Sequence, residues 1–95
     1  MKVIIGNKVT SKIEKNSSIQ KKIFAMLSQL NSYDQFNDAV IEMKLHLIQS
    51  PQLTYYSARV SFDYRLLLTY DGQENTCLIV DIVSHKDLEK KLKRP

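Results

Sequence analysis

Apolar and polar residues alternate through residues 54–71 and predict two strands that meet at a tight turn. In the first half, one face of an extended chain carries Tyr56, Ala58, Val60 and Phe62. Arg59 falls on the other, polar face, which is the period of two of a half-buried strand. In the second half, leucines and aromatics from Tyr64 to Tyr70 suit a more central strand. Arg65 is then a cation inside a mostly apolar strand, which is costly unless the charge is paired or faces a groove.

Helical spacing of apolar residues precedes this hairpin. Residues 17–20, Ser-Ser-Ile-Gln, have the spacing of a capping box and predict a helix that begins there. The apolar stripe behind it is Ile19, Ile23, Met26, Leu27 and Leu30. Such a stripe predicts a helix packed on a sheet. Val9 and Ile13, four apart among lysines, predict a short helix over 8–15, and a β-branched run predicts a strand over 2–6.

Residues 38–47 fit two interpretations, a helical turn through Val40 and Ile41 or an alternating strand through Met43 and Leu45. We favour an extended stretch over 43–48, which Pro51 then ends because proline removes a backbone donor.

A long β-branched run over 76–84 predicts a buried strand after the turn at 71–75. A hairpin symmetric about Gln73 pairs Arg65 with Asp81 across the strands, although a shift of one residue gives Asp81 another neighbour. His85 has the strand parity of Asp81. One interpretation is that all three residues cluster at one end of a sheet face. The other is that Arg65 and Asp81 form a purely structural ion pair and His85 is only the first residue of a helix. Leucines at 88 and 92 predict a short helix after the strand.

Length and charge limit the possibilities. The 95 residues predict one domain, 1–95, with a modest core. The net charge is +4, and five basic and two acidic residues lie from Lys86 onward, with the remainder near neutral. A basic end of this kind fits binding to RNA or DNA, binding to an acidic protein, or simply a solvated helix end.

The remaining composition indicates a cytoplasmic protein without a prosthetic group. Cys77 is the single cysteine, lies in an apolar run and is predicted to be a core thiol in a reducing compartment. No run is long enough for a signal peptide or a membrane span, so no membrane association is expected. His46 is a lone histidine with a structural or solvent-facing role, and no metal-ligand spacing exists, so neither a metal nor a cofactor is expected.

The order of elements, together with Y-S-A-R-V-x-x-x-Y-R-L-L-L over 56–68 and V-S-H-K-D-L over 83–88, resembles the RelE/ParE superfamily of bacterial toxins from type II toxin–antitoxin pairs. The resemblance covers nearly the whole chain. It implies a small α+β domain with an N-terminal strand and two helices, then an antiparallel sheet of consecutive hairpins and a short C-terminal helix. The helices would cover one face of the sheet, and the opposite, concave face would bind the target.

In the RelE branch, the resemblance implies a metal-independent endoribonuclease that cuts messenger RNA in the ribosomal A site and so inhibits translation. The ribose 2′-hydroxyl attacks the adjacent phosphate. Arg65 matches the arginine that stabilises the transition state, Arg59 would hold the scissile phosphate, and His85 would move a proton. The residues implied to bind the RNA backbone are Lys86, Lys90 and Lys91.

The chain departs from that branch at Leu88 and Glu89, where many of these RNases carry a tyrosine or a further basic residue. Two other functions therefore stay open. One is inhibition of DNA gyrase, as in the ParE branch, and the other is an inactive member that only binds its antitoxin and DNA. Each of the three implies a cognate antitoxin, whose acidic residues would meet Lys90, Lys91, Lys93 and Arg94.

Overall fold

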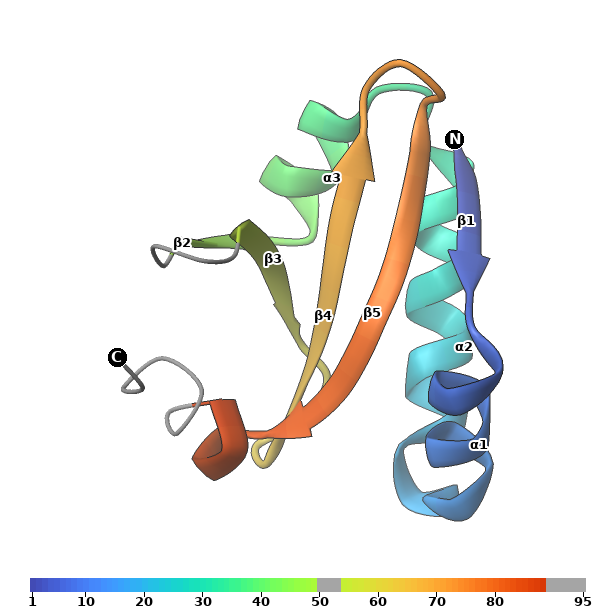
Figure 1. The fold of residues 1–95 in the computed structure, drawn as a ribbon, viewed down its shortest axis with the longest axis vertical. Coiled ribbons are helices and arrows are strands. Elements are labelled where there is room, and N and C mark those ends of the chain that lie inside the picture. The colour runs from blue at the N-terminus through green and yellow to red at the C-terminus, as the bar shows by residue number, and fades with distance from the viewer. Residues whose placement is uncertain (50–53, 89–95) are drawn as a thin grey trace.

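The computed structural model describes residues 1–49 and 54–88. The elements follow in this order: β1 (Lys2–Ile5), α1 (Asn7–Lys15), α2 (Ser17–Ser32), α3 (Phe36–Glu42), β2 (His46–Gln49), β3 (Thr54–Arg59), β4 (Tyr64–Asp71) and β5 (Thr76–Ser84). The strands form one sheet in the order β1-β5-β4-β3-β2 (Figure 1). The strands from β2 to β5 pair in chain order, each antiparallel to the next, as predicted. Strand β1 pairs in parallel with β5, so the sheet is mixed.

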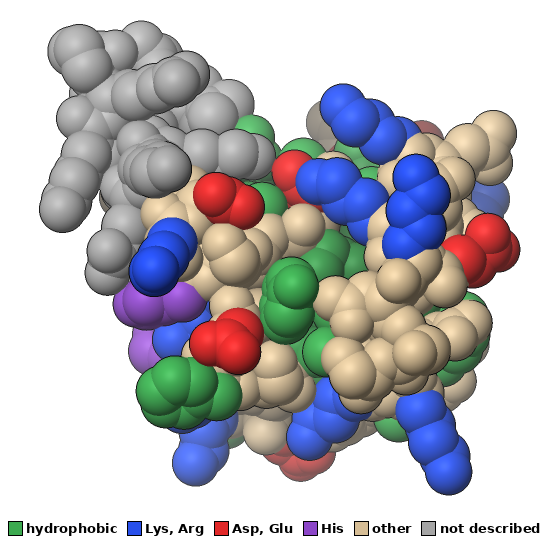
Figure 2. Space-filling view, turned by 90° about the horizontal axis from the view of Figure 1, so that it is seen from below, with side chains coloured by type: hydrophobic (Ala, Val, Ile, Leu, Met, Phe, Trp, Pro, Cys, Tyr) green, Lys and Arg blue, Asp and Glu red, His purple; other side chains and the backbone are tan. Residues whose placement is uncertain are grey.

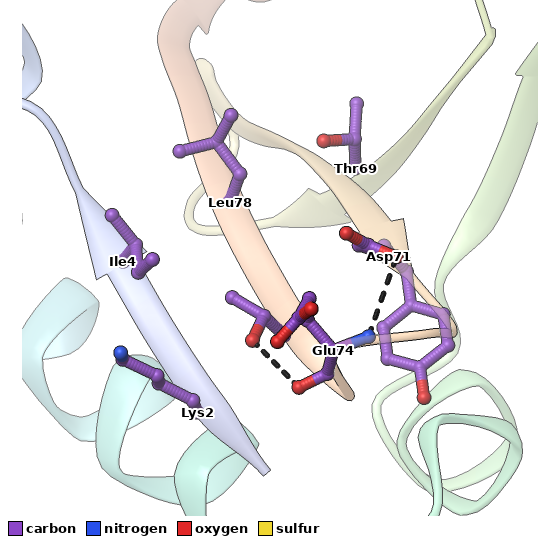
Figure 3. A pocket seen from close by; sticks show the side chains of 8 residues that line it. Lys2, Ile4, Thr69, Asp71, Glu74 and Leu78 are labelled. Atoms are coloured by element: carbon purple, nitrogen blue, oxygen red, sulfur yellow. Dashed lines mark hydrogen bonds between the residues drawn. The ribbon is translucent and has the colours of Figure 1, made fainter.

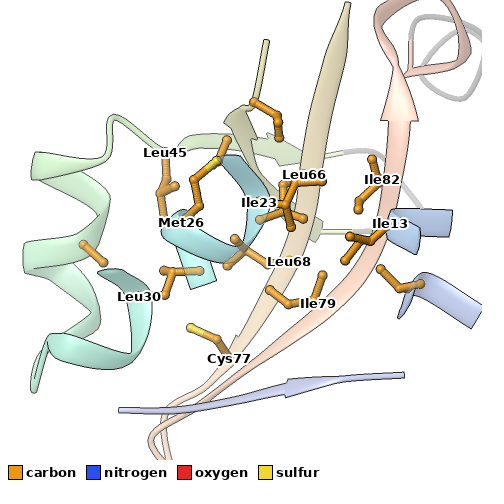
Figure 4. Packing of buried hydrophobic residues seen from close by; sticks show 14 of the residues in the cluster. Ile13, Ile23, Met26, Leu30, Leu45, Leu66, Leu68, Cys77, Ile79 and Ile82 are labelled. Atoms are coloured by element: carbon orange, nitrogen blue, oxygen red, sulfur yellow. The ribbon is translucent and has the colours of Figure 1, made fainter. Parts of the chain in front are cut away.

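All three helices pack on the same face of the sheet, which we call the helix-covered face. Their buried residues form one hydrophobic cluster with residues of β3, β4 and β5 (Figure 4). The predicted stripe of α2 supplies its centre, because Ile23 and Leu30 are both fully buried. Cys77 is also fully buried, as predicted, and this burial raises the pKa of its thiol to about 11.

The third helix, α3, corresponds to the helical interpretation of residues 38–47, which we did not favour. Its first residue, Phe36, stacks on Tyr70 at a centroid distance of 4.2 Å and meets Tyr56 edge-on at 4.9 Å, so aromatic contacts hold α3 to the sheet. The extended stretch begins at His46 rather than at residue 43, because Lys44 adopts a left-handed conformation with φ 54° that ends the helix. Residues 38–47 thus contain both predicted conformations, one after the other.

Helix α2 begins at Ser17 as predicted, but the capping box is absent. A single residue, Asn16, separates α1 from α2 and takes the N-cap position, so Ser17 is already helical. The hydroxyl of Ser18 donates to the Asn16 side chain at 2.8 Å instead of satisfying a helix backbone donor.

The β4–β5 hairpin has a different register from the predicted one. Arg65 lies opposite Val83, not opposite Asp81, and Asp81 lies opposite Leu67. The turn of residues 72–75 and a bulge beside Leu67 together move the partner of Arg65 two residues further along β5. The predicted cross-strand ion pair between Arg65 and Asp81 is therefore wrong.

The turn between β3 and β4 also differs from prediction. Strand β3 ends at Arg59, and the Val60 backbone N–H donates to the Tyr64 carbonyl at 3.0 Å, which closes the turn. Phe62 lies in this turn with 85% of its surface exposed, so its predicted core position is wrong.

Residues 85–88 form a helical turn after β5, which agrees with the predicted C-terminal helix as far as the description extends. Pro51 and the predicted RNA-binding residues Lys90 and Lys91 lie outside the described residues. No helix within 1–49 or 54–88 is long and apolar enough to cross a membrane.

Candidate active site

Two arginines lie side by side on the face of the sheet that the helices leave uncovered. Arg59 of β3 and Arg65 of β4 are direct cross-strand partners. Their neighbours Ala58 and Leu66 point into the core, and since side chains alternate along a strand, both arginines point the other way. We call this opposite side, which carries Arg59, Arg65, Leu67 and Val83, the open face.

The arginine pair is electrostatically unfavourable as it stands. Like charges directly opposite each other on neighbouring strands destabilise a sheet. Arg59 is exposed and Arg65 is half-buried, and among the described residues neither guanidinium has an ion pair or a hydrogen bond to a side chain. The two groups therefore present their donors to an anion, and a guanidinium can hold a phosphate through two parallel hydrogen bonds.

His85 lies at the same end of the sheet as the arginines. Its backbone N–H donates to the Asp63 carbonyl at 2.7 Å, which ties the end of β5 to the β3–β4 turn. The Ser84 hydroxyl accepts the Asp87 backbone N–H at 3.2 Å and so begins the helical turn with His85 as its first residue. Beside His85 is a hollow of about 260 Å³ lined by Asp63, Tyr64, Ser84, His85 and Lys86.

A small apolar cluster fixes the helical turn on the open face. Leu88 is 8% exposed and packs with Leu67 and Val83. The side chain of Leu88 thus contributes to packing, at a position where many RNases of the RelE branch carry a tyrosine or a basic residue. The backbone of the turn that carries His85 and Lys86 is held from both ends, by Ser84 and by Leu88.

Asp81, which we expected beside Arg65, instead meets α1. Its carboxylate accepts a hydrogen bond from the Lys12 ammonium at 2.6 Å. The sequence pattern around Lys12 or Asp81 did not indicate this contact, because the two residues are 69 positions apart in the chain. The predicted grouping of Arg65, Asp81 and His85 is therefore only partly present, because Arg65 and His85 share one end of the sheet and Asp81 pairs elsewhere.

A second hollow, of about 360 Å³, lies at the opposite end of β4, between β1, β5 and the β4–β5 turn (Figure 3). Its floor includes the exposed side chains of Ile4 and Leu78, and Asp71 and Glu74 stand at its rim. The Asp71 carboxylate accepts the Glu74 backbone N–H at 3.4 Å, which helps to fix the turn. Two carboxylates repel phosphate, so this hollow does not suit RNA. No sequence pattern predicted it.

The arginine end of the open face carries the groups that phosphoryl chemistry requires. Guanidinium donors stabilise charge on a five-coordinate phosphorus, and an imidazole can accept or donate a proton. The opposite end of β4, which carries Asp71 and Glu74 and which we call the acidic end, has no guanidinium or imidazole among the described residues that line its hollow. Its one cation there, among the same described residues, is the ammonium of Lys2. The candidate site is therefore Arg59, Arg65, His85 and Lys86.

No protein-family model matches the sequence, and neither does any curated protein. Solved structures do resemble the fold. The archaeal RelE–RelB complex from Pyrococcus horikoshii matches with a TM-score of 0.68 and 14% identity, over 87% of this chain and 92% of that chain. The RelBE2 toxin–antitoxin complex from Mycobacterium tuberculosis gives 0.63 and 17%, over 88% and 96%. The YoeB/ParE toxin from Agrobacterium tumefaciens gives 0.58 and 16%, over 90% and 99%. The RelE/ParE resemblance is thus confirmed at the level of the fold.

Proposed function

We propose that this chain is the toxin of a toxin–antitoxin pair and cleaves messenger RNA on the ribosome. The observation that carries the proposal is the cross-strand pair of Arg59 and Arg65 on the open face. A like-charged pair weakens a sheet, and an anion held between the two guanidiniums would relieve the repulsion. The likeness to toxins of solved toxin–antitoxin complexes supports the same conclusion.

In the proposed reaction the ribose 2′-hydroxyl attacks the adjacent phosphorus, and the bond from phosphorus to the 5′ oxygen breaks. The products are a 2′,3′-cyclic phosphate and a free 5′-hydroxyl. Arg65, half-buried and therefore restrained, would stabilise the charge on the phosphorane, and Arg59 would hold the phosphate from the exposed side. The proton lost by the 2′-hydroxyl and the proton gained by the 5′ oxygen need an acid–base group, and His85, which follows β5 at this end of the sheet, would supply it.

Lys86, which lines the hollow beside His85, would contact the RNA backbone. Lys90 and Lys91, which lie outside the described residues, remain proposed RNA-binding residues on the basis of the sequence alone. The proposed reaction at the bound phosphate needs no metal ion, because the guanidiniums of Arg59 and Arg65 supply the positive charge.

The partner that we propose is an antitoxin. Two of the similar structures are toxin–antitoxin complexes. An antitoxin that covered the open face would keep RNA from the arginines. Its acidic residues would also relieve the charge repulsion there.

A second candidate function follows from Leu88. Because this side chain is buried against Leu67 and Val83, it cannot act on a phosphate, and His85 and Lys86 are the basic groups that the turn of residues 85–88 adds to the arginines. An incomplete catalytic set favours a protein that acts by binding, either to DNA gyrase or only to its antitoxin and DNA.

The test is a cell-free bacterial translation reaction to which the purified chain is added, with the 5′ ends of the message mapped by primer extension. We expect new ends within translated codons, present only when ribosomes are included. An intact message and normal translation would contradict the nuclease proposal. A parallel supercoiling assay with purified gyrase then tests the second candidate, since loss of supercoiling with an intact message would assign the chain to gyrase.

A further inference from the structure

Positive charge is concentrated at the beginning of the chain as well as at its end. Residues 1–22 contain six lysines and one acidic residue, Glu14, whereas residues 23–85 contain seven acidic and three basic residues. The expectation of a near-neutral remainder holds only as an average of these two regions. Helices α1 and α2 carry most of the early lysines.

The fold brings this basic region to the same end of the molecule as the arginines. In Figure 1 the start of α2, the end of α1 and the β3–β4 turn all lie at the bottom. Figure 2 views that end directly, with histidine and nearby Lys or Arg side chains on the left and a second group of Lys or Arg side chains on the right. Two basic areas therefore flank one end of the sheet.

Two hollows that share one lining residue lie between the two areas. The hollow beside His85 includes Tyr64 in its lining, and Tyr64 also lines a hollow of about 260 Å³ at the α1–α2 junction. The other lining residues of this junction hollow are Lys12, Lys15, Asn16, Ile19 and Ile82. The surface thus runs from His85, past the half-buried ring of Tyr64, to the lysines where α1 meets α2.

We infer that an RNA strand bound at the arginines continues past Tyr64 onto Lys15 and Lys12, so that the α1–α2 junction binds phosphates beyond the cleaved bond. This inference rests on the proposed function. An aromatic ring between cations is the arrangement by which proteins bind single-stranded nucleic acid, with bases stacked on the ring and phosphates held by the charges. Continuity with a phosphate-binding site favours RNA over an acidic peptide as the occupant.

The two lysines differ in what they offer. Lys12 already contacts Asp81 at 2.6 Å, so the carboxylate offsets part of its charge. Lys15 is exposed and forms no ion pair with another described residue. Asp63 stands at the far side of Tyr64 and opposes RNA there. Lys15 is therefore the residue expected to hold a phosphate most strongly.

The experiment measures RNA binding by fluorescence anisotropy at several salt concentrations. The probe is a single-stranded RNA with 2′-O-methyl groups, which cannot be cleaved because no 2′-hydroxyl is free to attack. Each phosphate contact contributes roughly 0.7 to the negative slope of log affinity against log salt for a single strand. Lys15→Gln should therefore lower the slope by about 0.7 and weaken binding. The matched control is Lys2→Gln, which removes the same charge from an exposed residue at the acidic end of the sheet.

The outcomes separate the inference from the proposed function. Equal slopes for Lys15→Gln and Lys2→Gln, with binding that Arg65→Ala still weakens, would overturn the inference and leave the arginine site in place. Absence of RNA binding by the unmodified chain would also overturn the inference, whereas the proposed function is tested separately by cleavage in the translation reaction with ribosomes. Competition by poly-glutamate of equal charge that matches competition by RNA would also overturn the inference, because the junction would then bind any polyanion.

Discussion

The two faces of the sheet divide stability from chemistry. On the helix-covered face, sixteen buried residues within 1–49 and 54–88 form one continuous cluster, and they come from three helices, three strands and the loop positions Leu45 and Val60. On the open face, the part of the chain that the structure describes has one small buried cluster, Leu67, Val83 and Leu88. Most of the burial that stabilises the fold is therefore on the first face, and the second can carry charged groups at small cost to folding.

The arginine pair shows what this division permits. Arg59 and Arg65 oppose each other with like charge, an arrangement that a sheet optimised only for stability would avoid. Residues that break a local rule of stability in this way often mark a functional site. The same strands keep Ala58 and Leu66 in the core one residue away, so the conflict is confined to one face.

The largest effect that tests this comparison is expected on the helix-covered face. Leu66 is fully buried in the main cluster, so Leu66→Ala should lower the free energy of unfolding by about 2–5 kcal/mol. Urea unfolding followed by circular dichroism measures the change. A loss below about 1 kcal/mol would mean that this face does not supply the main stabilisation.

A much smaller change in the free energy of unfolding is expected from a substitution at Arg59, on the open face. Arg59→Ala should change the free energy of unfolding by less than about 0.5 kcal/mol, or raise it slightly, because it removes a like charge opposite Arg65. The same urea series measures it, with Lys2→Ala as the control for loss of an exposed lysine charge on another strand. A loss comparable to that of Leu66→Ala would show that Arg59 supports the fold and would break the division between the faces.

The division of the faces could be predicted from the sequence to a large extent. The stripe of α2 and the alternation through β3 and β4 depend on local spacing, which directly determines which side chains can share a face. Local spacing placed Arg59 and Arg65 on strands, the resemblance alone implied their functional roles, and the structure brings the two residues together on the open face.

The details that failed depend on contacts between distant parts of the chain. The bulge beside Leu67 changes the register of β5, and local sequence does not specify it. Asp81 pairs with Lys12 from a helix 69 residues earlier, so no local pattern indicated its partner. Helix α3 was an alternative that we did not favour, because its seven residues are too few for a clear apolar period and Phe36 is held by aromatic rings of the sheet.

The central claim is that the arginine end of the open face cuts RNA, and Arg65 tests it most directly. The measurement is the rate at which new 5′ ends appear in the cell-free translation reaction with Arg65→Ala, beside the unmodified chain and Lys2→Ala. All three proteins are first checked for equal unfolding midpoints. Loss of one preorganised donor to the transition-state charge should lower the rate by about 100-fold or more, while Lys2→Ala should leave it unchanged. A folded Arg65→Ala protein that cuts the message at the unmodified rate would contradict the account.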